Sequence, residues 1–193
     1  MNPVRLLGKM TAKGVRLDGG GGGPVLIPAS DVAAALGMGS LPRQVVLVGL
    51  AKYADDNQSQ LALRDWVMAR FRRRCVERGW KQNYADGLAL LVVYELVNPT
   101  RCPHCLGRGK RWLEVPVERG SDERVRRWTE CGRCKGGGVV RLSERDRAAI
   151  AGITKSTFND TWAQRADELF AELVSLEDRV LRHLWKQFGE EAA

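Results

Sequence analysis

Five cysteines carry the clearest chemical signal in this 193-residue sequence. Four of them form two Cys-x-x-Cys pairs, Cys102 with Cys105 and Cys131 with Cys134. Together the pairs supply the four thiolates of a tetrahedral zinc site, because a two-residue gap lets one tight turn present both sulfurs. Redox-active dithiols are the alternative, but no thioredoxin-like βαβ pattern accompanies them. The spacing therefore predicts one structural Zn²⁺ ion, since four cysteines leave no open catalytic position.

Both cysteine pairs are followed by the same glycine pattern. Each half reads Cys-x-x-Cys-x-Gly-x-Gly, ending at Gly109 in the first half and at Gly138 in the second. Glycine tolerates positive φ, so the chain can wrap back and point amide groups at the sulfurs. We expect His104, inside the first pair, to face outward and not to act as a fifth ligand. Cys75 is expected in the core, and His183 on the surface near a helix end.

Positive charge is concentrated in two parts of the chain. The sequence has 31 Lys and Arg against 23 Asp and Glu, a net charge of +8. Residues 64–81 hold seven basic and two acidic side chains, and residues 101–147 hold 13 basic and seven acidic ones. Such stretches suit a polyanion, of which nucleic acid is the obvious example, although a solvated arginine-rich helix face has the same composition.

Composition excludes several classes of protein. The longest apolar run, residues 88–94, is far shorter than the roughly 20 residues of a membrane-spanning helix, so no membrane partner is expected. The first residues contain no secretory signal, and an odd cysteine count with two close pairs favours a reducing, cytoplasmic location. No nucleotide-binding glycine loop or metal-spaced acid pair is present, so we expect no enzyme.

The elements that must position these residues are mostly helices. Periodicity and capping residues predict helices over residues 30–37, 42–54, 58–78 and 85–97, a further one over 143–150, and one long helix from residue 155. Strands over 111–117 and 125–130, with a turn at 120–122, predict a β-hairpin. We expect a mainly α fold: a helical bundle with a helix-turn-helix and an inserted four-cysteine zinc-binding β-hairpin module. Its segments are a flexible glycine-rich stretch (1–29), the N-terminal helices (30–100), the zinc-binding insert (101–140) and the C-terminal helices (141–193).

Residues 144–163 fit the pattern of a helix-turn-helix. Ala148 is the small residue in the first helix and Gly152 the turn, while Arg147 stands where an apolar residue is usual. Many plain helical hairpins fit the same pattern. If the motif binds DNA, its second helix presents four residues to phosphates and base edges: Lys155, Ser156, Asn159 and Asp160.

The order of these features resembles the Q-type late-gene antitermination proteins of lambdoid phages, the lambda branch in particular. The most specific stretches are Cys-Gly-Arg-Cys-Lys-Gly at 131–136 and Ile-Thr-Lys-Ser-Thr-Phe at 153–158. The resemblance runs from residue 30 to about the end of the chain. It implies a protein that binds double-stranded DNA at a late promoter and engages host RNA polymerase, including its sigma factor. It further implies action alongside NusA and the nascent RNA, in the bacterial cytoplasm, to carry polymerase through terminators.

Contacts with polymerase or the DNA backbone are our own hypothesis. The candidates are arginines of one helix face and of the hairpin: Arg70, Arg74, Arg78, Arg124, Arg126 and Arg127. A zinc-containing helix-turn-helix regulator that acts only at the promoter is the alternative function. The J-type co-chaperones share Cys-x-x-Cys-x-Gly-x-Gly, but they carry four copies and a His-Pro-Asp tripeptide, whereas this chain has two copies and no such tripeptide.

Overall fold

The computed structural model describes residues 27–117 and 124–189. The expected flexible segment 1–29 and the expected hairpin turn at 120–122 therefore lie almost wholly outside the described residues. The chain divides into two compact units. Met1–Asn98 and Ser143–Ala193 form one, which we call the helical unit, and Pro99–Leu142 form the other, the cysteine unit.

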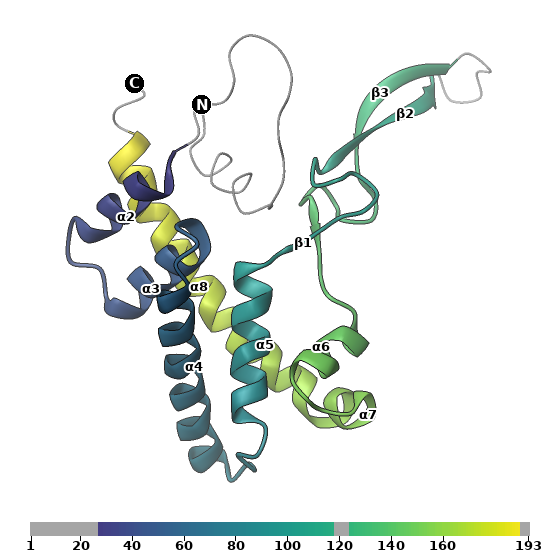
Figure 1. Cartoon of the computed structure of the whole chain (residues 1–193). Coiled ribbons are helices and arrows are strands. Elements are labelled where there is room, and N and C mark those ends of the chain that lie inside the picture. Colours follow the sequence, from purple (N-terminus) through teal and green to yellow (C-terminus); the bar gives the residue numbers. More distant parts are fainter. Residues whose placement is uncertain (1–26, 118–123, 190–193) are drawn as a thin grey trace. The chain divides into compact units, whose positions relative to one another are not determined.

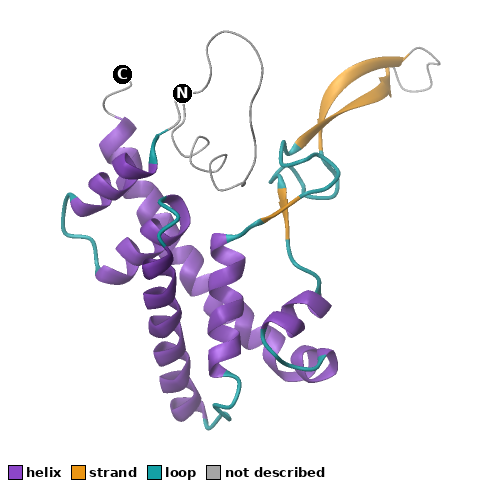
Figure 2. Ribbon diagram, viewed as in Figure 1, coloured by secondary structure: helices purple, strands orange, loops and turns teal. Residues whose placement is uncertain are grey.

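The helical unit is built from helices whose ends follow local signals (Figures 1 and 2). Asp56 caps one helix by accepting hydrogen bonds from the backbone N–H groups of Gln58 and Ser59, and Gly79, with φ of 65°, ends it. The helices are α2 (Ala29–Gly37), α3 (Arg43–Tyr53), α4 (Asn57–Arg78), α5 (Ala85–Val97), α6 (Glu144–Ile150), α7 (Lys155–Thr157), the π-helical turn η1 (Phe158–Trp162) and α8 (Ala163–Gly189). The predicted helix ends are confirmed to within one or two residues, except after residue 157.

The helical unit has one continuous apolar core. Helix α8 packs against α3 and α5, and α4 packs against the same two helices. Apolar residues at four-residue steps along α4 are buried, as are most apolar positions from η1 to the end of α8: Leu63, Val67, Phe71, Cys75, Phe158, Trp162, Ala166, Leu169, Leu173, Val180 and Leu184. Among the described residues, no helix is both long and apolar enough to cross a membrane.

The C-terminal helix is not the unbroken α-helix that its periodicity predicts. At η1 the Ala163 N–H donates to the Phe158 carbonyl, five residues back instead of four. Both end residues of this turn are buried: Phe158 in the core, and Trp162 against Phe71 and Tyr84, at ring-centroid distances of 6.2 and 5.4 Å. The wider turn changes the register of α8 relative to α7, which apolar spacing alone does not reveal.

The cysteine unit consists of two antiparallel strand pairs. Strand β1 (Thr100–Arg101) pairs with β4 (Val139–Val140), and β2 (Lys110–Pro116) pairs with β3 (Arg124–Glu130) (Figure 2). The predicted hairpin strands are confirmed with a shift of about one residue. The buried cluster of this unit is formed by Cys102, Cys105 and Cys131, with Cys134 and Val140 packed against it. With so little apolar burial, the unit depends on its cysteines.

Candidate metal centre

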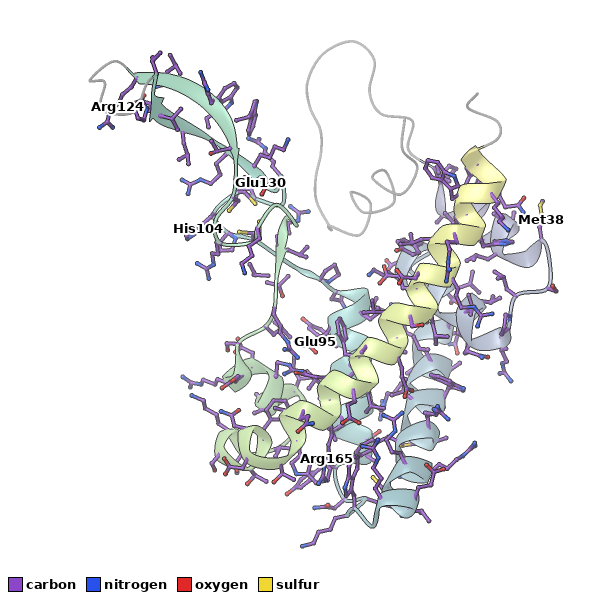
Figure 3. The ribbon with its side chains drawn as sticks, turned by 180° about the vertical axis from the view of Figure 1, so that it is seen from behind. Met38, Glu95, His104, Arg124, Glu130 and Arg165 are labelled. Atoms are coloured by element: carbon purple, nitrogen blue, oxygen red, sulfur yellow. The ribbon has the colours of Figure 1, made fainter. Side chains whose placement is uncertain are left out.

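The four paired cysteines meet at one point, as their spacing predicts. Their Sγ atoms all lie within 4.8 Å of one another. Cys102 Sγ is 3.8 Å from Cys131 Sγ, and Cys105 Sγ is 3.6 Å from Cys134 Sγ. Tetrahedral zinc with Zn–S bonds of about 2.3 Å places its sulfurs roughly 3.8 Å apart. The cluster is therefore positioned to bind one metal ion and is compatible with a structural zinc; its yellow sulfur atoms lie near the labelled His104 in Figure 3.

The two halves of the centre repeat each other at an offset of 29 residues. The Cys102 N–H donates to the Gly138 carbonyl at 2.9 Å, and the equivalent Cys131 N–H donates to the Gly109 carbonyl at 2.8 Å. Each half also turns an amide onto its own second cysteine: Gly109 N–H on Cys105 Sγ and Gly138 N–H on Cys134 Sγ, both at 3.3 Å. The prediction that the glycines aim amides at sulfur is confirmed.

Two glycines of this pattern combine positive φ with a backbone oxygen where a side chain would begin. Gly109 has φ of 72°, and a Cβ there would lie 2.1 Å from the Gly136 carbonyl oxygen. Gly138 has φ of 76°, and a Cβ there would lie 2.4 Å from the Gly107 carbonyl oxygen. Each half therefore needs a residue without a side chain where it approaches the backbone of the other half.

The surroundings of the sulfurs shift their acidity in opposite directions. Backbone N–H groups, that of Cys134 first, point at Cys131 Sγ and lower the pKa of this thiol to about 7. Burial raises the pKa of the Cys134 thiol to about 11. A divalent cation bound by the four sulfurs would hold all of them as thiolates and so override this difference.

The remaining histidines and cysteine lie outside the centre. His104 is exposed and accepts a hydrogen bond from Arg133 at 3.1 Å, so its expected outward position is confirmed. Cys75 is fully buried in the core, as predicted. The prediction for His183 is wrong: it is partly buried, and its Nε2 lies 2.8 Å from the Ala35 carbonyl oxygen, which ties α8 to α2.

The candidate DNA-reading residues lie together at the start of the segment after Gly152. Gly152 has φ of 66°, Thr154 caps α7, and all four candidates are exposed: Lys155, Ser156, Asn159 and Asp160. Asn159 already donates a hydrogen bond to Glu144 Oε2 at 2.7 Å. The structure thus has a helix, a turn and a second helical segment here, and the DNA-binding motif stays a prediction.

Arg147, which departs from the helix-turn-helix pattern, is buried and ion-paired with two carboxylates. It donates to Glu95 and to Asp167, each at 2.8 Å, and only 2% of it is exposed. Its guanidinium also lies 5.2 Å from the centre of the Phe158 ring. Sequence reasoning missed this cluster, since its members are far apart in the chain and no local motif marks them.

The arginines of α4 are engaged with α8. Arg78 pairs with Glu168 at 3.0 Å, Arg70 pairs with Glu172 at 3.4 Å, and Arg74 contacts both carboxylates. The Arg74 side chain is only 15% exposed. Arg74 thus forms an ion pair between helices with acidic side chains from a distant segment, and its contact with the DNA backbone or polymerase stays a prediction. Arg70 and Arg78 are partly exposed.

The hairpin arginines are exposed on β3: Arg124, Arg126 and Arg127. Arg126 pairs with Glu114 on β2 at 3.2 Å, and Figure 3 labels Arg124 near the far end of the strand. Their roles toward DNA or polymerase stay predictions.

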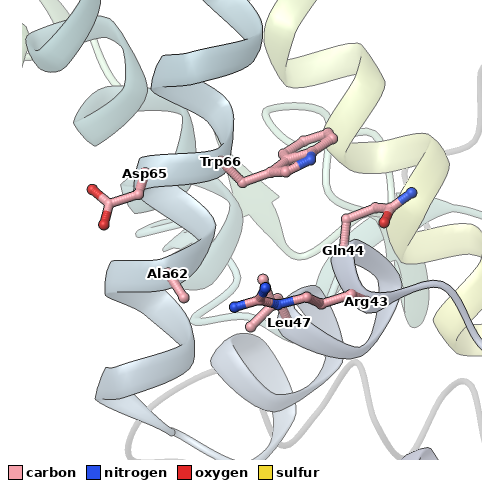
Figure 4. Close-up of a pocket in the computed structure, with 6 residues that line it drawn as sticks. All are labelled: Arg43, Gln44, Leu47, Ala62, Asp65 and Trp66. Carbon is pink, nitrogen blue, oxygen red and sulfur yellow. The ribbon is translucent and has the colours of Figure 1, made fainter.

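A hollow between α3 and α4 offers less chemistry than the cysteine cluster. It has a volume of about 320 Å³ and is lined by Arg43, Gln44, Leu47, Ala62, Asp65 and Trp66 (Figure 4). One cation and one carboxylate among apolar and amide groups supply neither a nucleophile with its base nor a metal-ligand set.

Comparison of the chain with protein-family models, curated proteins and solved structures finds no match. The functional assignment must therefore start from the cysteine cluster and the charges around it.

Proposed function

We propose that this protein is a DNA-binding transcription antitermination factor of the kind that the Q-type phage proteins represent. It binds double-stranded DNA at a late promoter, loads onto host RNA polymerase, and lets polymerase read through terminators. The observation that carries the proposal is the four-cysteine cluster with its repeated Cys-x-x-Cys-x-Gly-x-Gly halves, followed by the segment 153–158. The resemblance of these two stretches supports the transcriptional role.

Zinc is the ion that we assign to the cluster. Four thiolates with sulfur separations of 3.6 and 3.8 Å suit zinc, and a closed set of four ligands suits a structural role. In this proposal the ion holds the base of the β2–β3 hairpin, so that exposed arginines such as Arg127 are presented on a fixed scaffold.

Duplex DNA is assigned to the exposed side of α7 and η1. Lys155 can neutralise a phosphate, and Asn159 can read adenine once its hydrogen bond to Glu144 opens. Contact of Asn159 with a base requires breaking its hydrogen bond to Glu144, which lowers the net free energy gained on binding unless the Glu144 carboxylate finds another donor. We therefore expect Lys155 to contribute to binding of any sequence and Asn159 to the preferred one.

The first step of the test is to select duplex DNA that the protein binds from a random library. The selected sequence identifies the DNA element for the transcription assay. The selected element is then placed beside a promoter upstream of a terminator, and transcripts are measured with and without the protein. We expect readthrough with the wild-type chain, and loss of both element binding and readthrough when Lys155→Ala is combined with Asn159→Ala. Arg179→Ala, which changes an exposed cation of α8, is the matched control and should behave as wild type.

The experiment has three outcomes, which distinguish antitermination, regulation only at the promoter and a protein that does not bind DNA. Readthrough that depends on the selected element supports antitermination. Specific binding with equal readthrough in both reactions removes antitermination and favours a regulator that acts only at the promoter. No duplex selected from the library removes the DNA-binding function altogether.

A further inference from the structure

Two tryptophans lie side by side on the β2–β3 hairpin. Trp112 stands opposite Trp128 in the strand register, and their ring centroids are 4.6 Å apart with planes inclined by 32°. Trp112 is 55% exposed and Trp128 is 47% exposed. The pair is thus an aromatic surface that the described part of the chain leaves about half uncovered.

Cations border this aromatic surface on the side of the metal centre. A shallow hollow of about 170 Å³ is lined by both tryptophans and by His104, Cys105, Leu106, Arg108, Lys110 and Arg111. Arg108, Lys110 and Arg111 are exposed, and none of the three is ion-paired with another described residue. Basic side chains and the two tryptophan rings therefore line the same hollow.

Cations also continue along the hairpin on the other side of the pair. Side chains two and four residues apart in a strand share a face, so Arg126 and Arg124 lie on the same face of β3 as Trp128. Figure 3 labels Arg124 near the end of the hairpin. Arg126 shares its charge with Glu114, whereas Arg124 lies opposite Pro116. Along this face the tryptophan pair lies between two cross-strand pairs of one cation and one carboxylate, Lys110 opposite Glu130 and Arg126 opposite Glu114. Arg124 follows at the hairpin end, so cations outnumber carboxylates on the face.

Stabilisation of the hairpin accounts for part of this arrangement. Cross-strand aromatic pairs stabilise two-stranded hairpins, which are marginal by themselves. That role explains the contact between the rings, but it does not require cations on both sides of them. An aromatic face bordered by positive charge matches the chemistry of single-stranded nucleic acid, whose bases stack on the rings while its phosphates meet the cations.

The geometry points to a binding site for single-stranded nucleic acid centred on Trp112 and Trp128. An unpaired base stacks on the exposed indole surface, and the phosphates on either side contact Arg108 or Lys110 toward the metal centre and Arg124 toward the hairpin end. The site goes beyond the proposed function and does not depend on it, because it uses neither the α7–η1 segment nor a terminator.

The first test measures affinity for labelled single strands by fluorescence anisotropy. The probes are a 12-nucleotide oligouridylate and the matching oligothymidylate, with the full-length, metal-loaded protein. Replacing both tryptophans by isoleucine keeps strand propensity and apolar character but removes the rings. We expect binding about 5- to 150-fold weaker for each stacked base that is lost. Replacing both by tyrosine keeps an aromatic face and should restore most of the affinity.

Controls separate stacking from attraction by charge and from unfolding. Leu113→Ala changes an exposed residue that points to the opposite face of β2 and should leave affinity unchanged. Lys110→Gln, which changes the cation two residues before Trp112 on the same face of β2, should flatten the salt dependence of binding. The isoleucine variant should instead lose affinity by a similar factor at every salt concentration. Bound metal is measured in each preparation. Isoleucine and wild-type proteins that bind equally would show that the rings are not used, and the proposal would be wrong.

A second test uses the wild-type protein and so does not depend on how the variants fold. A strand carrying 5-iodouracil is irradiated in complex with the protein, and the cross-linked peptide is sequenced by mass spectrometry. We expect cross-links at Trp112 or Trp128. Cross-links confined to other segments, or no binding of either probe, would overturn the proposal whatever the outcome of the terminator assay.

Discussion

Single residues of the metal centre are constrained by backbone contacts as much as by sulfur chemistry. Gly109 and Gly138 each combine positive φ with a carbonyl oxygen where a Cβ would lie. Gly132, which lies between two ligands of the same centre, has nothing within 4 Å of its Cβ position. The three glycines therefore differ in function although they share a residue type.

This contrast gives a prediction at the residue scale. Gly109→Ala should weaken metal binding about 10- to 100-fold, because the added Cβ displaces the amide that supports Cys105 Sγ. Gly132→Ala is the control and should bind metal like the wild type. Affinity is measured by competition with a chromophoric chelator. Equal affinities for Gly109→Ala and the wild-type protein would contradict the role that we give to this contact.

At the scale of elements, buried and half-buried ion pairs join helices that are distant in sequence. Arg147 connects α6 to Glu95 of α5 and to Asp167 of α8, and Arg74 connects α4 to α8. Arg165 adds to the same region by lying over the Trp80 and Trp162 rings, at 4.0 and 4.5 Å. Helix α6 has seven residues, of which Arg147 and Ala148 are buried, so Arg147 is one of the two side chains that fix it to the core.

We therefore predict that Arg147→Ala lowers the free energy of unfolding by about 3–5 kcal/mol, because it leaves the Glu95 carboxylate buried without its partner. Arg145→Ala, which changes an exposed arginine of the same helix, should change it by less than about 0.5 kcal/mol. Urea unfolding followed by circular dichroism measures both. Adding Glu95→Gln to Arg147→Ala should recover part of the loss, and a loss that stays below about 1 kcal/mol in Arg147→Ala would show that the pair is not important for stability.

At the scale of the whole molecule, the two units are held together internally by different forces. The helical unit has a continuous apolar core, whereas the buried cluster of the cysteine unit is formed by metal-ligand cysteines. A small unit without an apolar core requires a cross-link or a metal ion to stay folded, and we propose that an ion bound by the four cysteines has this role. The two units should therefore respond differently to removal of the metal.

A chelator should unfold the cysteine unit and leave the helical unit folded. We expect cleavage by a protease at the arginines of residues 101–141 to become at least roughly tenfold faster, while the helical circular dichroism signal changes little. Adding Zn²⁺ back should restore protection, and Cys131→Ser should behave like the chelated protein. Loss of the helical signal on chelation would show that the helical unit also needs the ion.

Features that depend on local signals can be predicted from the amino-acid sequence alone. The ligand set Cys102, Cys105, Cys131 and Cys134 follows from spacing, and the amide contacts of Gly109 and Gly138 follow from the repeated glycines. Helix ends such as Asp56 and Gly79 are marked by capping chemistry within a few residues. In each case the residues that cooperate are close together in the chain, so a short stretch contains all the information.

The partner of each polar side chain depends instead on how distant elements pack together. Arg147 meets Glu95 across 52 residues, Arg74 meets Glu172 across 98, and His183 meets Ala35 across 148. The exposed Trp112–Trp128 pair likewise depends on a strand register, in which a shift of one residue moves a side chain to the other face. The charge of a residue, or its place in an apolar pattern, shows that it needs a partner. Many helices and strands offer side chains of the right kind, so the packing of whole elements selects the partner.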